Sequence, residues 1–279
     1  MPSIPFTKAH GALNDFLLTW ERDLPTLDAT FLNHTAQAIC HRNSGVGADG
    51  WIIIAPATPP LEGRIRLFNP DGGEVEISGN GTRCAGALLI ESGYAADEVR
   101  ILTGAGEKYM RVLKRHGRHF LFEMDMGSPV VAPGDIHTTL SLSTGEVNAT
   151  ILNVGNPQCA VFVEHFDFDW RSMGREIERH PRFPRRTNVS FVHVKNRESI
   201  DVRFFERGVG ETNSSGTGST GAMAAAVLRG LVGPQVLVQT PAGPLKLRWD
   251  KTILLEGPAE LTASGEFHLP ESEEKQRLS

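Results

Sequence analysis

The sequence predicts an α/β (α+β) protein of two pseudo-symmetric domains, each a mixed or antiparallel sheet wrapped around a central helix, with the functional site in the interdomain cleft. The pattern G-E-x-x-x-S-G-x-G-[ST] occurs twice, at 73–82 and at 210–219, which is an offset of 137 residues in a chain of 279. Patterns typical of strands outnumber those typical of helices. The chain is also long enough for two domains of about 140 residues, each with its own core.

Both copies of the repeat have the same neighbours. The alternating runs 64–68 and 200–205 predict a half-buried strand before each copy. After each copy, small and apolar residues at helical spacing predict a helix, which ends near Gly93 in the first half and at Gly230 in the second. Each half therefore contains a strand, a glycine-rich turn and a central helix in the same order.

The remaining elements complete the two halves. Two further helices are expected at 29–40 and 171–179, and further strands at 51–55, 99–103, 108–113, 119–124, 160–163, 189–194, 235–239 and 245–249. We place the first domain at 1–117 and the second at 118–264, and expect 265–279 to return to the first domain with a strand at 265–269. The charged tail 271–279 is expected to fray.

Composition argues against several classes of protein. A net charge of −5 without a basic stripe argues against nucleic-acid binding. No apolar run approaches the roughly 18 residues of a membrane span, and the N-terminus lacks the apolar core of a signal peptide. We therefore expect a cytoplasmic protein that binds no membrane. Three scattered cysteines, and ten histidines without ligand spacing, argue against a disulfide framework and against a metal site.

The two glycine-rich turns predict two helix N-termini, whose free backbone N–H groups and dipoles bind anions. In pseudo-symmetric halves, both ends can point into one cleft and hold a single carboxylate. Ser78 and Ser215 would then face the ligand from opposite sides. The alternative is that both serines are ordinary N-caps. Because a cap alone does not explain the matched S-G-x-G pair, we favour the shared cleft.

The second turn also fits G-x-G-x-x-G, the dinucleotide-binding pattern, at 216–221. That site needs an acidic residue about 20 residues further on, after the next strand. This chain has Gln239, Thr240 and Pro241 there. The turn also lacks the Lys-Ser/Thr pair that ends a phosphate-binding loop. We therefore expect no nucleotide.

Asparagines recur in loops beside short strands, at Asn14, Asn69, Asn156 and Asn188. Each of them alone is typical of a turn. Together with Glu206 and Arg207 at the end of a strand, they can line a polar pocket. Neutral amides and one Arg–Glu pair suit a zwitterionic amino-acid group.

Six segments together resemble the diaminopimelate epimerase family, which is part of the cofactor-independent two-base amino-acid racemase superfamily. They are FTKAHGALNDF, HRNSGVGADG, LFNPDGGEVEISGNGTRC, VGNPQC, HPRFPRRTNVSFV and ERGVGETNSSGTGS. They extend from Phe6 to Ser219 in the family's order, so the resemblance covers nearly the whole chain. The family fold, two pseudo-symmetric α/β domains with the site between them, agrees with the repeat.

The resemblance implies an isomerase that interconverts LL- and meso-diaminopimelate, for lysine and peptidoglycan precursors, with neither pyridoxal phosphate nor another cofactor nor a metal. In the family, one cysteine thiolate removes the α-proton and a second thiol delivers a proton to the opposite face. The positions that match these cysteines are Ser78 and Ser215, with Glu206 expected to modulate proton transfer. The implied substrate-binding residues are Asn14, Asn69, Gly79, Asn80, Asn156, Asn188, Glu206, Arg207, Gly216 and Thr217.

Three positions depart from the family pattern. Both catalytic cysteines are serine, and the histidine of the family's G-N-P-H segment is Gln158. Cys84 matches a family cysteine outside the catalytic pair. A thiol with a pKa near ~8.5 can become a thiolate beside a helix N-terminus, whereas a serine hydroxyl needs an adjacent base. The carboxylates available to assist a serine are Glu74, Glu76, Glu206 and Glu211.

Three explanations for the serines stay open: a deliberate Cys→Ser replacement, a natural enzyme that uses serines with other help, and loss of the epimerase step. Our leading hypothesis is an active isomerase with a small-molecule substrate. The alternatives are a catalytically silent amino-acid-binding homologue and a related isomerase or dehydratase with one general base. The sequence leaves a homodimer open and predicts neither nucleic-acid nor membrane partners.

Overall fold

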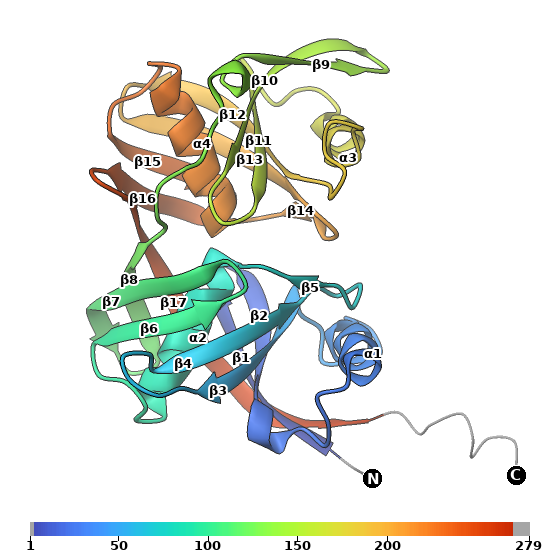
Figure 1. Cartoon of the computed structure of the whole chain (residues 1–279), viewed down its shortest axis with the longest axis vertical. Helices are drawn as coiled ribbons and strands as arrows, with labels where there is room; N and C mark the ends of the chain where they lie inside the picture. Colours follow the sequence, from blue (N-terminus) through green and yellow to red (C-terminus); the bar gives the residue numbers. More distant parts are fainter. Residues whose placement is uncertain (1–2, 270–279) are drawn as a thin grey trace, which may run out of the picture.

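The computed structural model describes residues 3–269. It is a mixed α/β protein that consists mostly of strands, as the sequence predicts. Figure 1 shows two units, one above the other, each with strands around one helix: α2 (Gly79–Glu91) below and α4 (Gly216–Leu228) above. Hydrogen bonds connect all 17 strands of the described residues. Within the described range, no helix has both the length and the apolar character that a membrane crossing requires.

The first unit is a closed ring of strands around α2. Its strands are β1 (Ser3–Gly11), β2 (Asn14–Trp20), β3 (Gly50–Pro56), β4 (Gly63–Phe68), β5 (Glu74–Val75), β6 (Glu98–Thr103), β7 (Gly106–His116), β8 (His119–Asp125) and β17 (Ile253–His268). The ring runs β1-β2-β3-β4-β6-β7-β8-β17 and returns to β1. The pairs β2–β3 and β4–β6 are parallel, because α1 (Ala29–Cys40) and α2 cross between their strands. A short 3-10 helix, η1 (Glu21–Asp23), follows β2.

The second unit repeats this order of elements. Its strands are β9 (Thr138–Leu142), β10 (Gly145–Asn153), β11 (Pro157–Phe162), β12 (Asn188–Asn196), β13 (Ser199–Glu206), β14 (Gly210–Thr212), β15 (Gln235–Thr240) and β16 (Gly243–Trp249). The 3-10 helix η2 (Pro133–Asp135) precedes them. Here β11–β12 and β13–β15 are the parallel pairs, and α3 (Trp170–Glu178) and α4 cross between them. The repeat seen in ten residues of sequence therefore extends to the pairing pattern of both units.

Strand β17 joins the two units. It pairs with β16 at its start, then with β8, and finally with β1, where Ser3 lies opposite His268. The sequence predicted a returning strand only at 265–269, because Gly257 and Pro258 interrupt the apolar pattern earlier. The domain boundary predicted between residues 117 and 118 falls in the turn between β7 and β8, which pair with each other. This boundary stays a prediction. The tail 271–279 lies outside the described residues.

The two central helices are buried on all sides because small or apolar residues surround their axes. Every residue from Gly79 to Ile90 in α2, and from Gly216 to Ala226 in α4, is buried. The small residues allow close packing: a Cβ atom added to Gly86 would lie 2.6 Å from Sδ of Met110. Packing on all sides therefore holds each central helix, and with it the position of its N-terminus.

Candidate active site

The N-termini of α2 and α4 meet at the junction of the two units. A Cβ atom added to Gly79 would lie 3.2 Å from Cα of Gly216, and one added to Gly216 would lie 3.1 Å from Cα of Gly79. Ser78 and Ser215 precede these glycines, and each hydroxyl oxygen accepts a hydrogen bond from the backbone N–H three residues on, at 3.2 and 3.0 Å. The serines are thus N-caps, as the alternative interpretation held, and they also stand at two adjoining helix ends.

This close approach predicts a specific cost for a methyl group at the junction. Gly216→Ala is expected to lower the free energy of unfolding by about 1–3 kcal/mol, because the two helix ends must move apart to admit the Cβ atom. It should also weaken ligand binding in the cleft. Urea denaturation measures the first effect, with Gly134→Ala as the control, since no atom lies within 4 Å of a Cβ there. Equal stability of Gly216→Ala and the unchanged protein would contradict the prediction.

The two serines have different neighbours. Ser215 Oγ donates a hydrogen bond to Oε2 of Glu206 at 2.9 Å, and Thr212 Oγ1 donates to Oε1 of the same carboxylate at 2.6 Å. Among the described residues, no carboxylate is hydrogen-bonded to Ser78. The adjacent base that a serine requires therefore stands at one of the two positions.

The structure distinguishes Glu206 from the three other carboxylates considered as assistants. Each of those three forms an ion pair with an arginine instead: Glu74 with Arg66, Glu76 with Arg207, and Glu211 with Arg171. Only Glu206, of the four, is hydrogen-bonded to a serine in the described structure. The resemblance implied a role for Glu206 in proton transfer, but the sequence did not show which of the two serines it contacts.

The surroundings of Glu206 change its acidity. Burial raises the pKa of this carboxyl above its ordinary value, and the hydrogen bonds from Thr212 and Ser215 offset part of that rise. A carboxylate with a raised pKa is a stronger base than an ordinary glutamate. Glu206 is therefore suited to accept a proton through Ser215.

A small cavity of about 40 Å³ lies beside the Ser215–Glu206 pair. Many of the predicted site residues line it: Asn14, Asn69, Ser78, Asn156, Asn188, Glu206 and Arg207. They come from loops and strand ends that are far apart in the sequence and belong to both units. The polar pocket expected from scattered asparagines and the Glu–Arg pair therefore exists as a shared space between the units.

The other predicted residues lie directly behind the wall of this cavity. Asn80 is fully buried, and its Nδ2 donates to Oδ1 of Asn14 at 3.2 Å and to the carbonyl of Ser214 at 3.3 Å. In the second unit, Asn156 Nδ2 donates to Oγ1 of the buried Thr217 at 3.3 Å. Asn80 and Thr217, which match each other in the repeat, thus each contact a cavity-lining asparagine.

Arg207 connects the two units at the other end of the cavity. Its guanidinium is paired with Glu76 of the first unit, and its backbone carbonyl accepts from Nδ2 of Asn69 at 3.2 Å. The backbone N–H of Arg207 donates to Oδ1 of Asn188 at 3.0 Å. Because Glu76 neutralises the guanidinium, a bound carboxylate would have to replace or join that pair.

Sequence reasoning missed several residues of the cavity. Asp49 accepts from Nδ2 of Asn14 at 2.8 Å, and Thr212 donates to Glu206. Asp49 lies within the HRNSGVGADG segment, so the resemblance contained the signal without indicating its role. The apolar lining residues carry no recognisable pattern: Phe16, Leu67, Val75, Ile77 and Val209.

Gln158, one of the three departures from the family pattern, contacts the same asparagine that lines the cavity. Its Nε2 donates to Oδ1 of Asn156 at 2.7 Å, so the amide of Asn156 presents its NH₂ group to Thr217. Among the described residues, Oε1 of Gln158 has no hydrogen-bond partner. In this chain Gln158 therefore fixes the orientation of Asn156.

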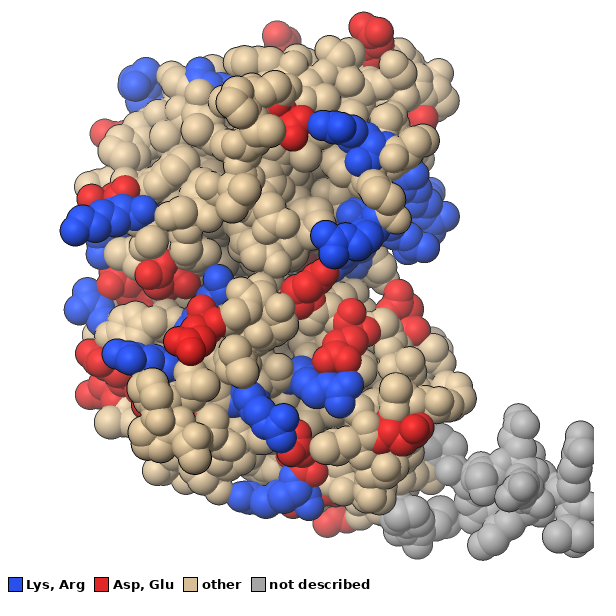
Figure 2. Space-filling model, viewed as in Figure 1, with Lys and Arg blue, Asp and Glu red and all other residues tan. Residues whose placement is uncertain are grey.

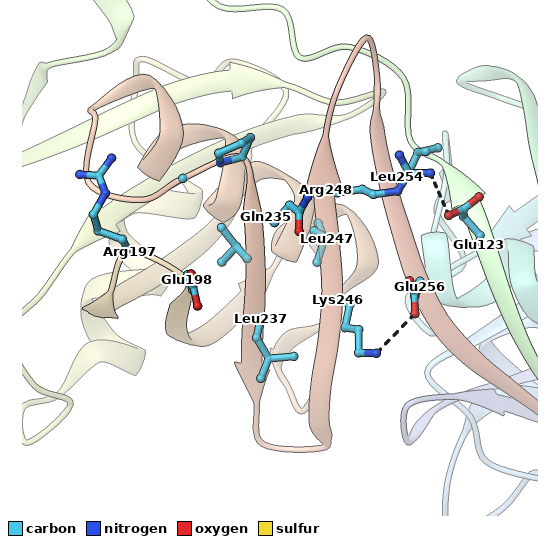
Figure 3. A pocket seen from close by; sticks show the side chains of 13 residues that line it. Glu123, Arg197, Glu198, Gln235, Leu237, Lys246, Leu247, Arg248, Leu254 and Glu256 are labelled. Atoms are coloured by element: carbon cyan, nitrogen blue, oxygen red, sulfur yellow. Dashed lines mark hydrogen bonds and ion pairs between the residues drawn. The ribbon is translucent and has the colours of Figure 1, made fainter.

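The surface of the molecule shows two further features. Figure 2 shows acidic and basic residues mixed over one face, with a gathering of Lys and Arg at the edge of the upper unit beside the hollow between the units. A broader groove of about 700 Å³ crosses the outer face of β15, β16 and β17, with the ion pairs Lys246–Glu256 and Arg248–Glu123 along it (Figure 3). None of the predicted site residues lines this groove.

The two units, with the same order of elements and their central helices end to end, form a fold that solved epimerase and PhzF-family structures share. A hydroxyproline epimerase from Agrobacterium vitis superposes with a TM-score of 0.75 over 95% of this chain and 92% of its own, at 15% identity. A PhzF-family phenazine biosynthesis protein from Bacillus anthracis gives a TM-score of 0.66 over 96% of this chain and 100% of its own, at 15% identity. These similarities show the fold alone.

The chain belongs to the diaminopimelate epimerase family. The diaminopimelate epimerase family model matches residues 6–132 and 150–261. The diaminopimelate epimerase of Pelotomaculum thermopropionicum is 40% identical over 278 residues, which cover 94% of this chain and 98% of that protein. The one of Moorella thermoacetica is 38% identical over 288 residues, with 95% and 99% covered. The resemblance inferred from six sequence segments is confirmed.

Proposed function

We propose that this protein interconverts LL- and meso-diaminopimelate by proton transfer at the α-carbon, with Ser78 and Ser215 on opposite faces of that carbon. The observation that supports this most directly is the pair of adjoining helix N-termini, each preceded by a serine, with Glu206 hydrogen-bonded to one of them. Helix N-termini bind carboxylates through free N–H groups and their dipoles. The α-carboxylate would bind there, between the two serines.

The distal amino-acid end of the substrate would occupy the cavity near Arg207. A bidentate guanidinium suits its carboxylate, and the amide groups of Asn69, Asn156 and Asn188 suit the rest of the zwitterion. In this position Glu76 exchanges its contact with Arg207 for one with the substrate. The two ends of diaminopimelate would thus meet different groups, which keeps one α-carbon between the serines.

Ser215 and Ser78 exchange protons with the α-carbon in two steps. Ser215 Oγ accepts the α-proton while its own hydroxyl proton passes to Glu206, and the electron pair of the broken C–H bond stays on the α-carbon next to the carboxylate. Ser78 then gives its hydroxyl proton to the opposite face, and the N–H of Gly81 that donates to Ser78 Oγ stabilises the resulting negative charge. Protons move between side chains and substrate only, so this scheme requires neither a metal nor pyridoxal phosphate.

The cavity must enlarge to admit such a substrate. A volume of about 40 Å³ holds only a few water molecules, far less than a seven-carbon diamino diacid. We propose that the two pseudo-symmetric units act as domains that separate at the cleft to bind substrate and close again over it. Closure excludes water, and this prevents a carbanion-like intermediate from exchanging its proton with solvent.

A proton NMR time course with LL-diaminopimelate in deuterated water tests this function. We expect loss of the α-proton signal together with appearance of the meso isomer. Ser215→Ala should abolish both, whereas Ser214→Ala, which changes the neighbouring serine, should leave them intact. Binding seen by saturation transfer, with the α-proton retained over days, would contradict epimerisation and favour an amino-acid-binding homologue.

One observation favours a second candidate, an isomerase or dehydratase with a single general base. Glu206 contacts Ser215, and the described structure gives Ser78 no carboxylate partner. A product that has lost water, or that is not a stereoisomer of the substrate, would identify this activity in the same experiment. In either case we propose a cytoplasmic protein with a small-molecule substrate, and light scattering in solution tests the homodimer that the sequence leaves open.

A further inference from the structure

Arg83, in the second turn of α2, is a buried cation that no acidic residue within 3–269 neutralises. Its side chain is 0% exposed. Nε donates to the carbonyl of Pro258 at 3.0 Å, one terminal nitrogen donates to the carbonyl of Gly79 at 3.2 Å, and the other donates to Oδ1 of Asn80. Among the described residues, no Asp or Glu forms an ion pair with it. All three partners are neutral oxygens.

A charge in this environment is energetically unfavourable for the folded protein. Burial lowers the pKa of Arg83 to about 10, which leaves the guanidinium charged at neutral pH. Removing a cation from water is energetically costly unless a counter-charge compensates it. A structural hydrogen-bonding role alone does not require this charge.

The repeat shows that a neutral residue can make the equivalent local bond. The position in α4 that matches Arg83 is Thr220, and its Oγ1 donates to the carbonyl of Gly216 at 2.8 Å. That carbonyl is the counterpart of the Gly79 carbonyl that Arg83 contacts. The N-terminal turn of α4 is thus completed by a hydroxyl group, while the same turn of α2 carries a positive charge.

The backbone around Arg83 leaves room for its guanidinium. A Cβ atom added to Gly257 of β17 would lie 2.7 Å from Cζ of Arg83, and one added to Gly11, at the end of β1, would lie 3.2 Å from its terminal nitrogen. The neighbouring strand residues are glycine at both places. The charge therefore occupies a site formed by the fold, directly beneath the first turn of α2.

A chain of hydrogen bonds connects this charge to the cavity. Arg83 donates to Oδ1 of Asn80, which leaves Nδ2 of Asn80 to donate to Asn14 and to the carbonyl of Ser214 in the second unit. Asn14 lines the cavity. The orientation of both amides thus follows from the contact with Arg83.

We propose that Arg83 is a positioning residue of the cleft, which orients Asn80 and Asn14 and supplies the positive potential that holds a carboxylate at the N-terminus of α2. The inference deepens the proposed function, since the carboxylate there would be the α-carboxylate of the substrate. It makes the two faces of the site unequal. The Ser78 side has a buried cation, which favours negative charge on Ser78, and the Ser215 side has the carboxylate of Glu206.

The test uses inorganic sulfate as the anion, so that it does not depend on turnover. Backbone amide NMR shifts of Gly79 to Gly81 report its binding to the full-length protein, and the rest of the spectrum reports the fold. We expect sulfate to bind at least tenfold more weakly to Arg83→Gln than to the unchanged protein. Thr220→Val, the matched change in α4 that removes the same type of bond without a charge, should alter the affinity less than about threefold.

Arg83→Lys provides a second measurement if Arg83→Gln does not fold. A buried lysine titrates well below its ordinary pKa, so the sulfate affinity of this variant should fall at least fivefold between about pH 6 and about pH 10, relative to the unchanged protein over the same range. Three results would overturn the proposal: no sulfate-dependent shifts in the unchanged protein, equal affinity in a folded Arg83→Gln variant, or no relative fall in Arg83→Lys. Failure of the NMR time course alone would instead concern the proposed reaction.

Discussion

The double variant Ser78→Cys with Ser215→Cys is expected to exchange the α-proton of diaminopimelate at least about a hundredfold faster than the unchanged protein, within the range that a positioned acid or base contributes. A thiol reaches its anionic form far more readily than a hydroxyl, and helix N-termini lower its pKa further. Both serines already stand at such ends. Ser78→Cys should contribute more than Ser215→Cys, since Glu206 already assists Ser215.

The three native cysteines give this experiment a clean background. Cys40, Cys84 and Cys159 are buried, and burial raises the pKa of each thiol to about 12. They should resist iodoacetamide at neutral pH, while the introduced thiols react. A double variant with two reactive thiols and no gain in exchange would mean that the cavity no longer holds diaminopimelate productively. That result would favour the binding homologue or the single-base enzyme.

The repeat was the most informative feature of the sequence. A ten-residue pattern with six matched positions, together with its neighbours, predicted two strands, two turns and two central helices, and the observed α2 and α4 occupy those places. Local patterns also predicted the helix at 29–40, which is α1, and the one at 171–179, which α3 matches to within a residue. These elements were predictable because apolar periodicity and capping residues act over a few residues.

The strands that the sequence did not predict depend on distant partners. β1 carries His10 and Lys8 among its apolar residues, and its pairing with β17 shifts register between Lys8 and Ala9. Much of β17 was not predicted, because Gly257 interrupts its apolar pattern. A side chain at Gly257 would collide with the guanidinium of Arg83. No local pattern reveals such a contact, because it forms only after the chain has folded.

The candidate site shows the same contrast. Residue types and the resemblance indicated the asparagines, Glu206 and Arg207, and the structure brings them to one cavity. The position of Glu206 beside one of the serines depends on how β13 and β14 pair. In the observed register, Thr212, at the end of β14, donates a hydrogen bond to Glu206. Sequence spacing could not distinguish Glu206 from Glu211, whose side chain forms an ion pair with Arg171.

Glu206→Gln is expected to reduce α-proton exchange by about 10²- to 10⁴-fold, the usual contribution of a general base. The amide keeps the size of the side chain and can still accept from Thr212, but it cannot take up the proton of Ser215. Glu211→Gln, a change of the same kind at an exposed ion pair, should have little effect. Exchange in Glu206→Gln at the rate of the unchanged protein would show that another group is the base.

The pH dependence provides an independent check on the same residue. Glu206 accepts a proton only when ionised, so exchange should fall as the pH is lowered through its pKa, and burial places that pKa above the ordinary 4.5. The hydrogen bond from Thr212 lowers this pKa, so Thr212→Val, which removes the bond, should move the acidic limb of the profile to higher pH. Glu206→Gln should lack this limb altogether. A carboxylate that loses a hydrogen-bond donor must become a stronger base. If the acidic limb of the pH profile does not move in Thr212→Val, the group that titrates there is therefore not Glu206.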